Sequence, residues 1–353
     1  MANGGSPEPA PLAFDPDPGV PLRLLAACPA YRPSPLRAVR DQADHELLIK
    51  DESERLGLGS FKALGGVYAV ARLVERRWSE TGHGPREPEN FRSAEVKDLA
   101  RAMTFVCASA GNHGLAVATG ARLFGARARI HLSAGVSERF EQRLIAKDAT
   151  VLRSGETYED SVAEASRDAE ATGAILLADG SWPGYFDPPS LVMEGYNVIA
   201  QELRTRFEER GDWPSHVFIQ AGVGGLAASM AISIRERWAR QPDIIVVEPD
   251  AAACLQASHE AGRPLRAEGP ASTMGRLDCK EPSLIAFHAL ERAEVGYLAV
   301  TDDEAEAAAD ELADLGLPTT ASGAAGLAGL RKGGSSRTGF GPRPLIIVTE
   351  GQF

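Results

Sequence analysis

Short apolar runs alternate with longer amphipathic segments along most of the chain. The apolar runs predict strands at residues 47–50, 104–108, 129–132, 150–153, 175–177, 216–220, 244–247 and 345–348. Apolar residues at helical spacing predict helices at residues 67–77, 114–124, 137–146, 158–172, 189–210 and 226–240. Because strands and helices alternate, we expect an α/β fold with a mainly parallel sheet, in which ligands bind beyond the carboxyl ends of the strands.

Three polar stretches interrupt this pattern. We expect residues 83–98 to form a surface insertion, and residues 333–344, which are rich in Gly, Ser and Arg, to form a loop before the last strand. The Pro- and Gly-rich residues 1–19 are expected to be disordered. They lack the basic-then-apolar start of a signal peptide, so we predict none.

The composition is that of an ordinary globular protein and excludes some classes of partner. The 353 residues carry 37 basic and 49 acidic side chains, a formal net charge of −12 that disfavours nucleic acid or an anionic membrane. No apolar stretch approaches the ~20 residues needed to span a bilayer. The four cysteines lie far apart without a C-x-x-C pair, which argues against a metal site and a disulfide framework and favours a cytoplasmic location.

One lysine stands at a predicted strand–loop–helix junction. Lys62 follows Phe61 and precedes the pair Gly65 and Gly66. A lysine held rigidly at such a junction can form a Schiff base with an aldehyde cofactor, and partial desolvation lowers its pKa. A surface lysine at the start of a helix would show the same local sequence.

Two loops of small residues follow predicted strands and lead into predicted helices. Their residues are Ser109, Ala110, Gly111, Asn112 and His113 in the first, and Gly222, Val223, Gly224, Gly225 and Leu226 in the second. Backbone N–H groups at a helix N-terminus bind anions such as a phosphate or a carboxylate. An ordinary helix cap would also explain the first loop, and the second lacks the lysine of a nucleotide-triphosphate loop.

Two further polar residues follow predicted strands. Asp179 is suited to act as a general base whose pKa is raised by partial burial, although a turn former is the alternative. Thr349 follows the last strand, where its hydroxyl would face either the nitrogen of a ring or water.

The order of these motifs resembles that of the fold-type II pyridoxal-phosphate enzymes, the group of the tryptophan synthase β chain and of the threonine and serine dehydratases. Within this group the chain is most similar to diaminopropionate ammonia-lyase, over about residues 27–351. The similarity is carried by Tyr31-Arg32-Pro33-Ser34-Pro35-Leu36, Lys50-Asp51-Glu52-Ser53, Phe61-Lys62-Ala63-Leu64-Gly65-Gly66, Asp179-Gly180-Ser181-Trp182-Pro183-Gly184-Tyr185, Met193-Glu194-Gly195-Tyr196, Gln220-Ala221-Gly222-Val223-Gly224, Val247-Glu248-Pro249-Asp250, Thr273-Met274 and Glu281-Pro282.

This resemblance implies an architecture and a cofactor. It implies two α/β domains with pyridoxal 5'-phosphate in the cleft between them. The large cofactor-binding domain would comprise residues 20–64 and 186–353, and the small domain residues 65–185. The association with this family also suggests a homodimer.

The resemblance also implies roles for the motif residues. Lys62 would hold the cofactor through a Schiff base, with Phe61 packed beside the ring. The other cofactor contacts would come from Asn112 at the ring hydroxyl, Thr349 at the ring nitrogen, and the backbone of Gly222, Val223, Gly224, Gly225 and Leu226 at the phosphate. The substrate carboxylate would be taken by Ser109, Ala110, Gly111 and His113.

The implied reaction is β-elimination from a small amino acid such as 2,3-diaminopropionate, which gives pyruvate and ammonia. Relatives that accept both enantiomers carry an acid where this chain has Ala110. We therefore expect a preference for the L isomer, with Lys62 taking the Cα proton and Asp179 assisting at the β-substituent, or the reverse.

Three alternatives stay open at this stage. Ala110 also makes the first loop similar to that of the serine and threonine dehydratases, so the leaving group is either an amine or a hydroxyl. Ala321 stands where relatives often carry an acid, which leaves the environment of the ring open. A β-replacement synthase and a catalytically silent protein that keeps the fold are the other two possibilities.

Overall fold

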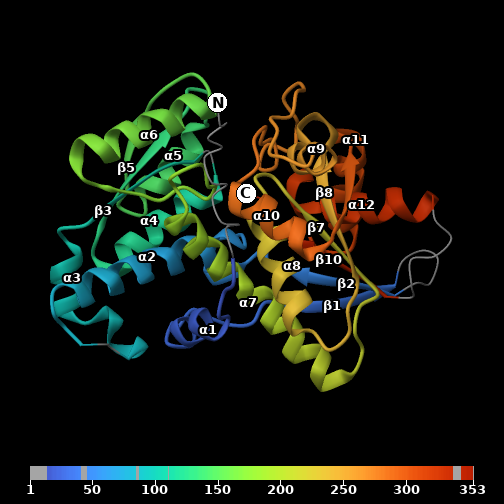
Figure 1. Ribbon diagram of the computed structural model, residues 1–353, viewed down its shortest axis with the longest axis horizontal. Coiled ribbons are helices and arrows are strands. Elements are labelled where there is room, and N and C mark those ends of the chain that lie inside the picture. Colours follow the sequence, from blue (N-terminus) through green and yellow to red (C-terminus); the bar gives the residue numbers. More distant parts are fainter. Residues whose placement is uncertain (1–13, 41–45, 85–86, 110, 337–342, 353) are drawn as a thin grey trace, which may run out of the picture.

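The computed structural model describes residues 14–40, 46–84, 87–109, 111–336 and 343–352 (Figure 1). Of the segment predicted to be disordered, residues 1–13 lie outside this description. Phe14 is buried, and the first helix begins at Gly19. The α/β fold class predicted from the sequence is confirmed.

The larger of the two sheets contains six strands in the order β1-β2-β10-β7-β8-β9. Its strands are β1 (Leu36–Arg40), β2 (Glu46–Asp51), β7 (His216–Gln220), β8 (Asp243–Pro249), β9 (Gly296–Val300) and β10 (Pro344–Val348). All pairs are parallel except β1 with β2. Every residue of β10 is buried, as expected for a central parallel strand covered on both faces.

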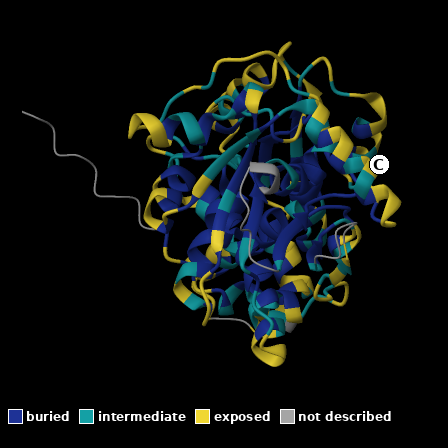
Figure 2. Cartoon of the chain, turned by 90° about the vertical axis from the view of Figure 1, so that its right-hand side faces the viewer, coloured by how far each residue is buried: buried dark blue, intermediate teal, exposed yellow. Residues whose placement is uncertain are grey.

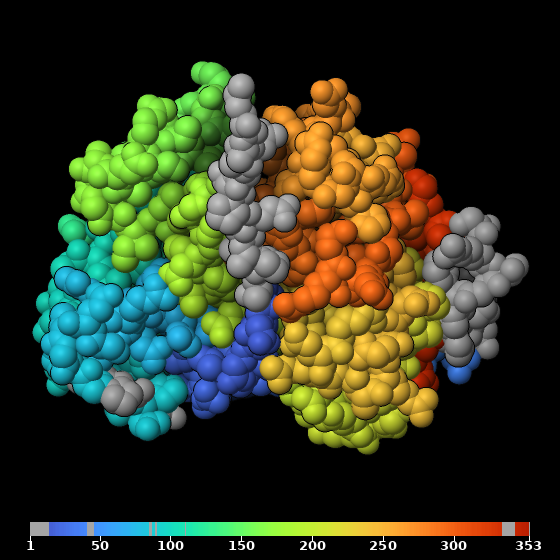
Figure 3. All heavy atoms as spheres, viewed as in Figure 1, coloured from blue at the N-terminus to red at the C-terminus, as the bar shows by residue number. Residues whose placement is uncertain are grey.

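The smaller sheet contains four parallel strands in the order β5-β4-β3-β6. Its strands are β3 (Thr104–Ala108), β4 (Arg127–Leu132), β5 (Thr150–Arg153) and β6 (Ile175–Leu176). Figure 3 shows the cyan and green part of the chain, which includes this sheet, on the left, and the yellow and orange part on the right. The two sheets therefore belong to two neighbouring lobes of one molecule.

Helices cover both sheets, so that the central strands form the buried interior (Figure 2). The α-helices are α1 (Gly19–Ala26), α2 (Lys62–Glu80), α3 (Ala94–Ala100), α4 (Asn112–Phe124), α5 (Glu138–Ile145), α6 (Tyr158–Thr172), α7 (Asp187–Arg210), α8 (Gly225–Arg237), α9 (Cys254–Ala261), α10 (Leu284–Ala293), α11 (Asp302–Asp314) and α12 (Ala321–Ser336). Short 3-10 turns are η1 (Arg55–Gly57), η2 (Pro88–Arg92) and η3 (Asp250–Ala252). Within the described ranges, none of the helices combines the length and apolarity that a bilayer crossing requires.

The two predicted loops need correction. Residues 83–98 include η2 and the start of α3, and Phe91 and Val96 are buried, so this segment is not merely a surface insertion. Residues 333–336 continue helix α12 rather than forming a loop, while residues 337–342 lie outside the described part of the chain. The low apolar content of both stretches hid their structure from the sequence.

Helix α2 crosses helix α7 at unusually close range. A Cβ atom on Gly65 would lie 2.6 Å from the Val192 carbonyl oxygen, and one on Gly195 would lie 2.7 Å from the Leu64 carbonyl oxygen. Gly66 is equally restricted, because a Cβ there would lie 2.6 Å from the Cβ of Ala116 in α4. The glycines after Lys62 therefore allow α2 to pack closely on α7 and α4. A methyl group at either glycine would have no room.

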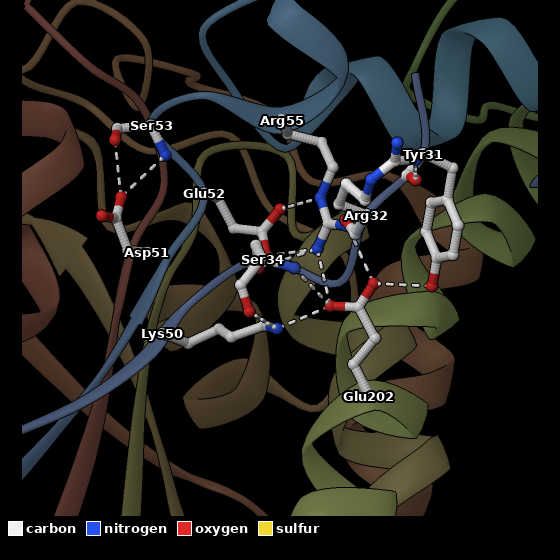
Figure 4. A network of polar contacts seen from close by, with 9 residues as sticks. All are labelled: Tyr31, Arg32, Ser34, Lys50, Asp51, Glu52, Ser53, Arg55 and Glu202. Carbon is white, nitrogen blue, oxygen red and sulfur yellow. Dashed lines mark hydrogen bonds and ion pairs between the residues drawn. The ribbon is translucent and has the colours of Figure 1, made fainter. Parts of the chain in front are cut away.

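A buried network of charges fixes the chain just before α2 (Figure 4). Glu202 of α7 accepts hydrogen bonds from Lys50 of β2 at 2.6 Å and from Arg55 of η1 at 2.8 Å. Arg55 also bonds Glu52 at 2.7 Å, so two cations face two anions. Tyr31 donates a further bond to Glu202 at 2.9 Å.

These charges are removed from water, which makes each of them depend on the others. The side chains of Lys50 and Arg55 are 2% and 1% exposed and that of Glu202 is 4% exposed. Burial, the largest effect, raises the pKa of Glu202, but Arg55 and Lys50 outweigh it and hold that pKa below its usual value. The network therefore joins β2 and η1 to α7 with ionised groups.

We expect Glu202→Ala to lower the free energy of unfolding by about 3–5 kcal/mol, because it leaves two buried cations without their shared anion. Glu208→Ala on the same helix removes a pair with Arg204 whose side chains are 32% and 44% exposed, and should cost less than about 1 kcal/mol. Urea unfolding of both variants measures the difference. Equal losses would show that the network contributes no more than a surface pair.

Candidate functional site

A cavity of about 270 Å³ lies where the ends of strands β3, β7 and β10 meet the first turns of α2, α4 and α8. Its lining includes all the site residues predicted from the sequence that the structure describes: Phe61, Lys62, Ser109, Gly111, Asn112, His113, Asp179, Gly222, Val223, Gly224, Gly225, Leu226 and Thr349. Ala110 lies outside the described residues. Among the lining residues that sequence reasoning did not select are Tyr158, Gln220, Arg276, Cys279 and Glu350.

Lys62 is held at the cavity by the chain on either side of it. The backbone N–H of Phe61 bonds the Thr349 carbonyl oxygen at 3.1 Å, and Ser60 forms a β-bridge with Glu350. The Lys62 ammonium lies 5.3 Å from the centre of the Phe61 ring and 5.8 Å from that of Tyr196. The segment before α2 is thus docked on the segment after β10.

Asp179 is the polar partner of Lys62. Lys62 Nζ donates a hydrogen bond of 2.5 Å to Asp179 Oδ2, and the two side chains are 21% and 16% exposed. Asp179 comes from the segment after β6, so the pair bridges the two lobes. A short, partly buried ion pair of this kind is strong because little water screens it.

The pKa of each partner departs from its usual value because of the other. Burial, the largest effect, lowers the pKa of Lys62, but the charge of Asp179 outweighs it and leaves this pKa above the ordinary range. Burial likewise raises the pKa of Asp179, yet Lys62 and then His113 bring it well below the ordinary range. The raised pKa of Asp179 expected from the sequence is therefore wrong for this state, since partial burial does not act alone.

The first loop is braced by one hydroxyl group. Ser109 Oγ accepts hydrogen bonds from the N–H groups of Gly111 at 3.1 Å and Gly114 at 2.9 Å. It also lies 3.1 Å from the Gly111 carbonyl oxygen, to which it donates. Ser109 thus shapes the loop with its side chain.

His113 lies under the same loop, where its side chain is buried and contacts a backbone oxygen. It is 3% exposed, and burial, the largest effect, lowers its pKa. Its Nε2 lies 2.8 Å from the Leu177 carbonyl oxygen, an arrangement in which the nitrogen carries the proton and donates it. His113 therefore links α4 to the strand end beside Asp179.

Asn112 and Glu350 meet across the cavity. Asn112 Nδ2 donates a hydrogen bond to Glu350 Oε2, while Glu350 Oε1 accepts one from Thr320 at 2.5 Å. The Oδ1 atom of Asn112 is buried and has no hydrogen-bond partner among the described residues. A buried acceptor left in this state is suited to a donor from a bound ligand.

The second loop leads into α8 through a left-handed glycine. Gly224 has φ +98°, a conformation that favours glycine, and Gly225 begins the helix. A Cβ on Gly222 would lie 3.0 Å from the sulfur of Cys279, so the loop admits no side chain there. Amide groups of the first helical turn have no acceptor within the helix and attract an anion.

Thr349 stands at the carboxyl end of β10, beside Gln220 at the end of β7. Gln220 Nε2 lies 3.2 Å from Thr349 Oγ1 and also donates to the carbonyl oxygens of Gly323 and Ile347 at 2.9 and 3.0 Å. The Thr349 hydroxyl accepts from Gln220, so its own proton is available to an acceptor in the cavity.

The residues that sequence reasoning missed had weak signals. Glu350 belongs to the Thr349-Glu350-Gly351 motif, in which only the threonine was predicted to contact a ligand. Arg276 and Cys279 lie between two motifs, Thr273-Met274 and Glu281-Pro282, in a segment without regular structure. A loop residue is found only when the fold brings it to the cavity.

Comparison with known proteins extends these observations. A family model described as "Pyridoxal-phosphate dependent enzyme" matches residues 27–350. The diaminopropionate ammonia-lyase of Escherichia coli (strain K12) is 32% identical over 281 residues, which are 78% of this chain and 69% of the relative. A probable D-serine dehydratase of Vibrio cholerae is 24% identical over 223 residues, 61% of this chain and 49% of that protein.

Solved structures of diaminopropionate ammonia lyase from Escherichia coli are similar over almost the whole chain. The complex with D-serine has a TM-score of 0.82 at 27% identity and covers 98% of this chain and 91% of that chain. A second complex, with an aminoacrylate-PLP azomethine reaction intermediate, has the same score at 29% identity. With the sequence match over residues 27–350, these findings establish that the chain belongs to the family of pyridoxal-phosphate dependent enzymes and has the fold-type II architecture.

Proposed function

We propose that this protein is a β-eliminating ammonia-lyase that acts on a small L-amino acid and releases a 2-keto acid and ammonia. The observation that carries the proposal is the pair of Lys62 and Asp179 in a cavity with an anion-binding glycine loop. The similarity to diaminopropionate ammonia-lyase and to a D-serine dehydratase supports the same class of reaction.

The cavity residues fit pyridoxal phosphate. Asn112 has an unused buried acceptor for the ring hydroxyl, Thr349 has a hydroxyl proton for the ring nitrogen, and the glycine loop before α8 suits the phosphate. Lys62 would hold the aldehyde carbon, and Phe61 lies beside it. When bound, the cofactor withdraws electrons from the substrate and makes its Cα–H bond acidic.

We infer that Lys62 takes the Cα proton and that Asp179 assists the departure of the β-substituent. An amine removes a proton only in its neutral form, which Lys62 reaches when it leaves the ion pair with Asp179. Without that positive charge, burial raises the pKa of Asp179, because burial is the largest effect on this group. Asp179 would then carry a proton that it can give to the leaving group.

The preference for the L isomer follows from the alanine at position 110, where relatives that accept both enantiomers carry an acid. Alanine at position 110 cannot exchange a proton, which leaves Lys62 and Asp179 as the proposed acid–base groups. Two leaving groups suit this arrangement, the amine of 2,3-diaminopropionate and the hydroxyl of L-serine. The names of the relatives support the two leaving groups, an amine for diaminopropionate ammonia-lyase and a hydroxyl for D-serine dehydratase.

With the enzyme loaded with pyridoxal phosphate, we expect keto acid from L-2,3-diaminopropionate or L-serine at rates about 10²-fold or more above those of the D isomers, the size typical of one acid–base group. Lys62→Ala should abolish this activity, and Lys97→Ala, at an exposed lysine of α3, should not. A spectrophotometric keto-acid assay measures each rate. Comparable rates for both enantiomers contradict the stereochemical proposal.

Two other outcomes separate the alternatives. Product formed by adding a thiol or an amine in place of keto acid would identify a β-replacement synthase. A change in cofactor absorbance on adding amino acids, without any keto acid, would identify a protein that binds but does not eliminate.

Asp179→Asn should lower the pKa of Lys62 in the cofactor-free protein. Asparagine removes the charge that raises this pKa and leaves the burial that lowers it, so we expect a shift of about one unit or more. The pH dependence of imine formation with pyridoxal phosphate reports it, because only the neutral amine reacts. The midpoint should move to lower pH in this variant and stay in place in Asp187→Asn, whose exposed carboxylate pairs with Arg76. An unchanged or higher midpoint in Asp179→Asn rules out the assigned cause.

A further inference from the structure

An arginine lies against the loop that we assign to the substrate carboxylate. A Cβ atom added to Gly111 would lie 2.7 Å from Nη1 and 2.8 Å from Cζ of Arg276, so the guanidinium packs directly on this glycine. Arg276 Nε lies 3.8 Å from Glu350 Oε2, and its side chain is 40% exposed. Arg276 lines the same cavity as Lys62.

The segment that carries Arg276 spans the cavity from one loop to the other. Arg276 packs on Gly111 at the proposed substrate end, while the sulfur of Cys279 lies 3.0 Å from the position of a Cβ on Gly222, at the proposed phosphate end. The backbone N–H of Arg276 bonds Ser322 Oγ at 3.1 Å, which ties this segment to α12. The guanidinium of Arg276 therefore lies at the substrate end, while its backbone oxygen lies 3.3 Å from the position of a Cβ on Gly222.

A second arginine, Arg143 of helix α5, lies near Arg276. The ring of Phe140 has Arg143 Cζ at 5.8 Å and Arg276 Cζ at 6.0 Å from its centre. Burial lowers the pKa of Arg143, and the charges of Arg276 and Arg139 lower it further, against a smaller effect of Glu350. Arg143 and Arg276 thus bring positive charge to this corner of the cavity, where Glu350 supplies a carboxylate.

We propose that Arg276 selects substrates that carry a second anionic group, a carboxylate or a phosphate, on or beyond Cβ. This inference rests on the proposed function and narrows its substrate class. A guanidinium binds either anion through paired, charge-assisted hydrogen bonds. The same charge disfavours the second ammonium group of 2,3-diaminopropionate and has little effect on the neutral hydroxyl of serine.

Elimination from such substrates balances without a further reactant other than water. Lys62 takes the Cα proton, the Cα–Cβ double bond forms, and the bond from Cβ to oxygen breaks. O-Phospho-L-serine loses phosphate with the bonding electron pair, whereas 3-hydroxy-L-aspartate loses hydroxide, which takes a proton from Asp179 and leaves as water. Hydrolysis of the released imine gives ammonia with pyruvate in the first case and with oxaloacetate in the second.

The test compares the loaded wild-type enzyme with Arg276→Gln and Arg276→Lys on O-phospho-L-serine, 3-hydroxy-L-aspartate and L-serine. The readouts are kcat/KM for keto acid and Kd from titration of the cofactor absorbance. We expect Arg276→Gln to lower the preference for the acidic substrates over serine about tenfold or more, the size of one charge-assisted hydrogen bond. Arg276→Lys should keep part of this preference, because it keeps the charge.

A matched control variant removes an exposed arginine on a helix that packs against the smaller sheet. Arg167→Gln, in α6, takes away a side chain that is 66% exposed and pairs with Glu164, and it should leave the preference unchanged. The acidic substrate whose kcat/KM falls more in Arg276→Gln identifies the preferred anion. That anion is phosphate for O-phospho-L-serine and carboxylate for 3-hydroxy-L-aspartate. Either one supports the proposal.

Two results would overturn it. Wild-type enzyme that binds neither acidic amino acid better than serine has no second anion site. An equal loss on all three substrates in Arg276→Gln would place Arg276 at the α-carboxylate, or in the folding of the loop. If no amino acid yields keto acid, the proposed elimination fails, yet the absorbance titrations still decide whether Arg276 selects an anion.

Discussion

The carboxylate of Glu202 is the point on which the placement of the cavity depends. It gathers Lys50 and Arg55 into one buried group, although these residues are 152 and 147 positions away along the chain. Because a buried cation is costly without its anion, the turn before α2 has little freedom to rearrange. The same turn ends at Ser60 and Phe61, which pair with the chain after β10. The position of the adjacent lysine thus depends in part on a charge network, Lys50, Arg55 and Glu202, that does not line the cavity.

Inside the cavity, the charges of Lys62 and Asp179 depend on each other. Lys62 and Asp179 keep each other ionised, and each would tend to lose its charge if the other became neutral. Formation of a covalent bond at the lysine therefore alters the carboxylate without any movement of the backbone. His113 lies beside the pair and, after Lys62, also lowers the pKa of Asp179.

The sequence predicted the central strands well because buried parallel strands are continuous apolar runs, as in β7 and β10. It missed β1, an edge strand whose residues are mostly exposed or half-buried, and α11, whose alanines and acidic residues give little apolar periodicity. β1 is held by pairing with β2 and α11 by packing on α12, contacts that apolar periodicity does not indicate.

The candidate site was predictable to the extent that its residues stand in motifs at strand ends. The lysine, both loops and Thr349 were located in this way, whereas Arg276 was not, because nothing in its own segment indicates where it folds. Sequence reasoning also missed the packing role of Gly65 and Gly66, which let helices approach, and gave the wrong direction for the Asp179 pKa. Both errors come from contacts that only the folded chain makes.

Glu350 joins parts of the protein that would otherwise be separate. Through its two carboxylate oxygens it links Asn112 at the start of α4 to Thr320 just before α12, and so connects the lobe of the smaller sheet to that of the larger. A molecule that draws the Asn112 amide to itself would release this latch. Together with the pair of Lys62 and Asp179, Glu350 therefore couples occupancy of the cavity to the contact between the two lobes.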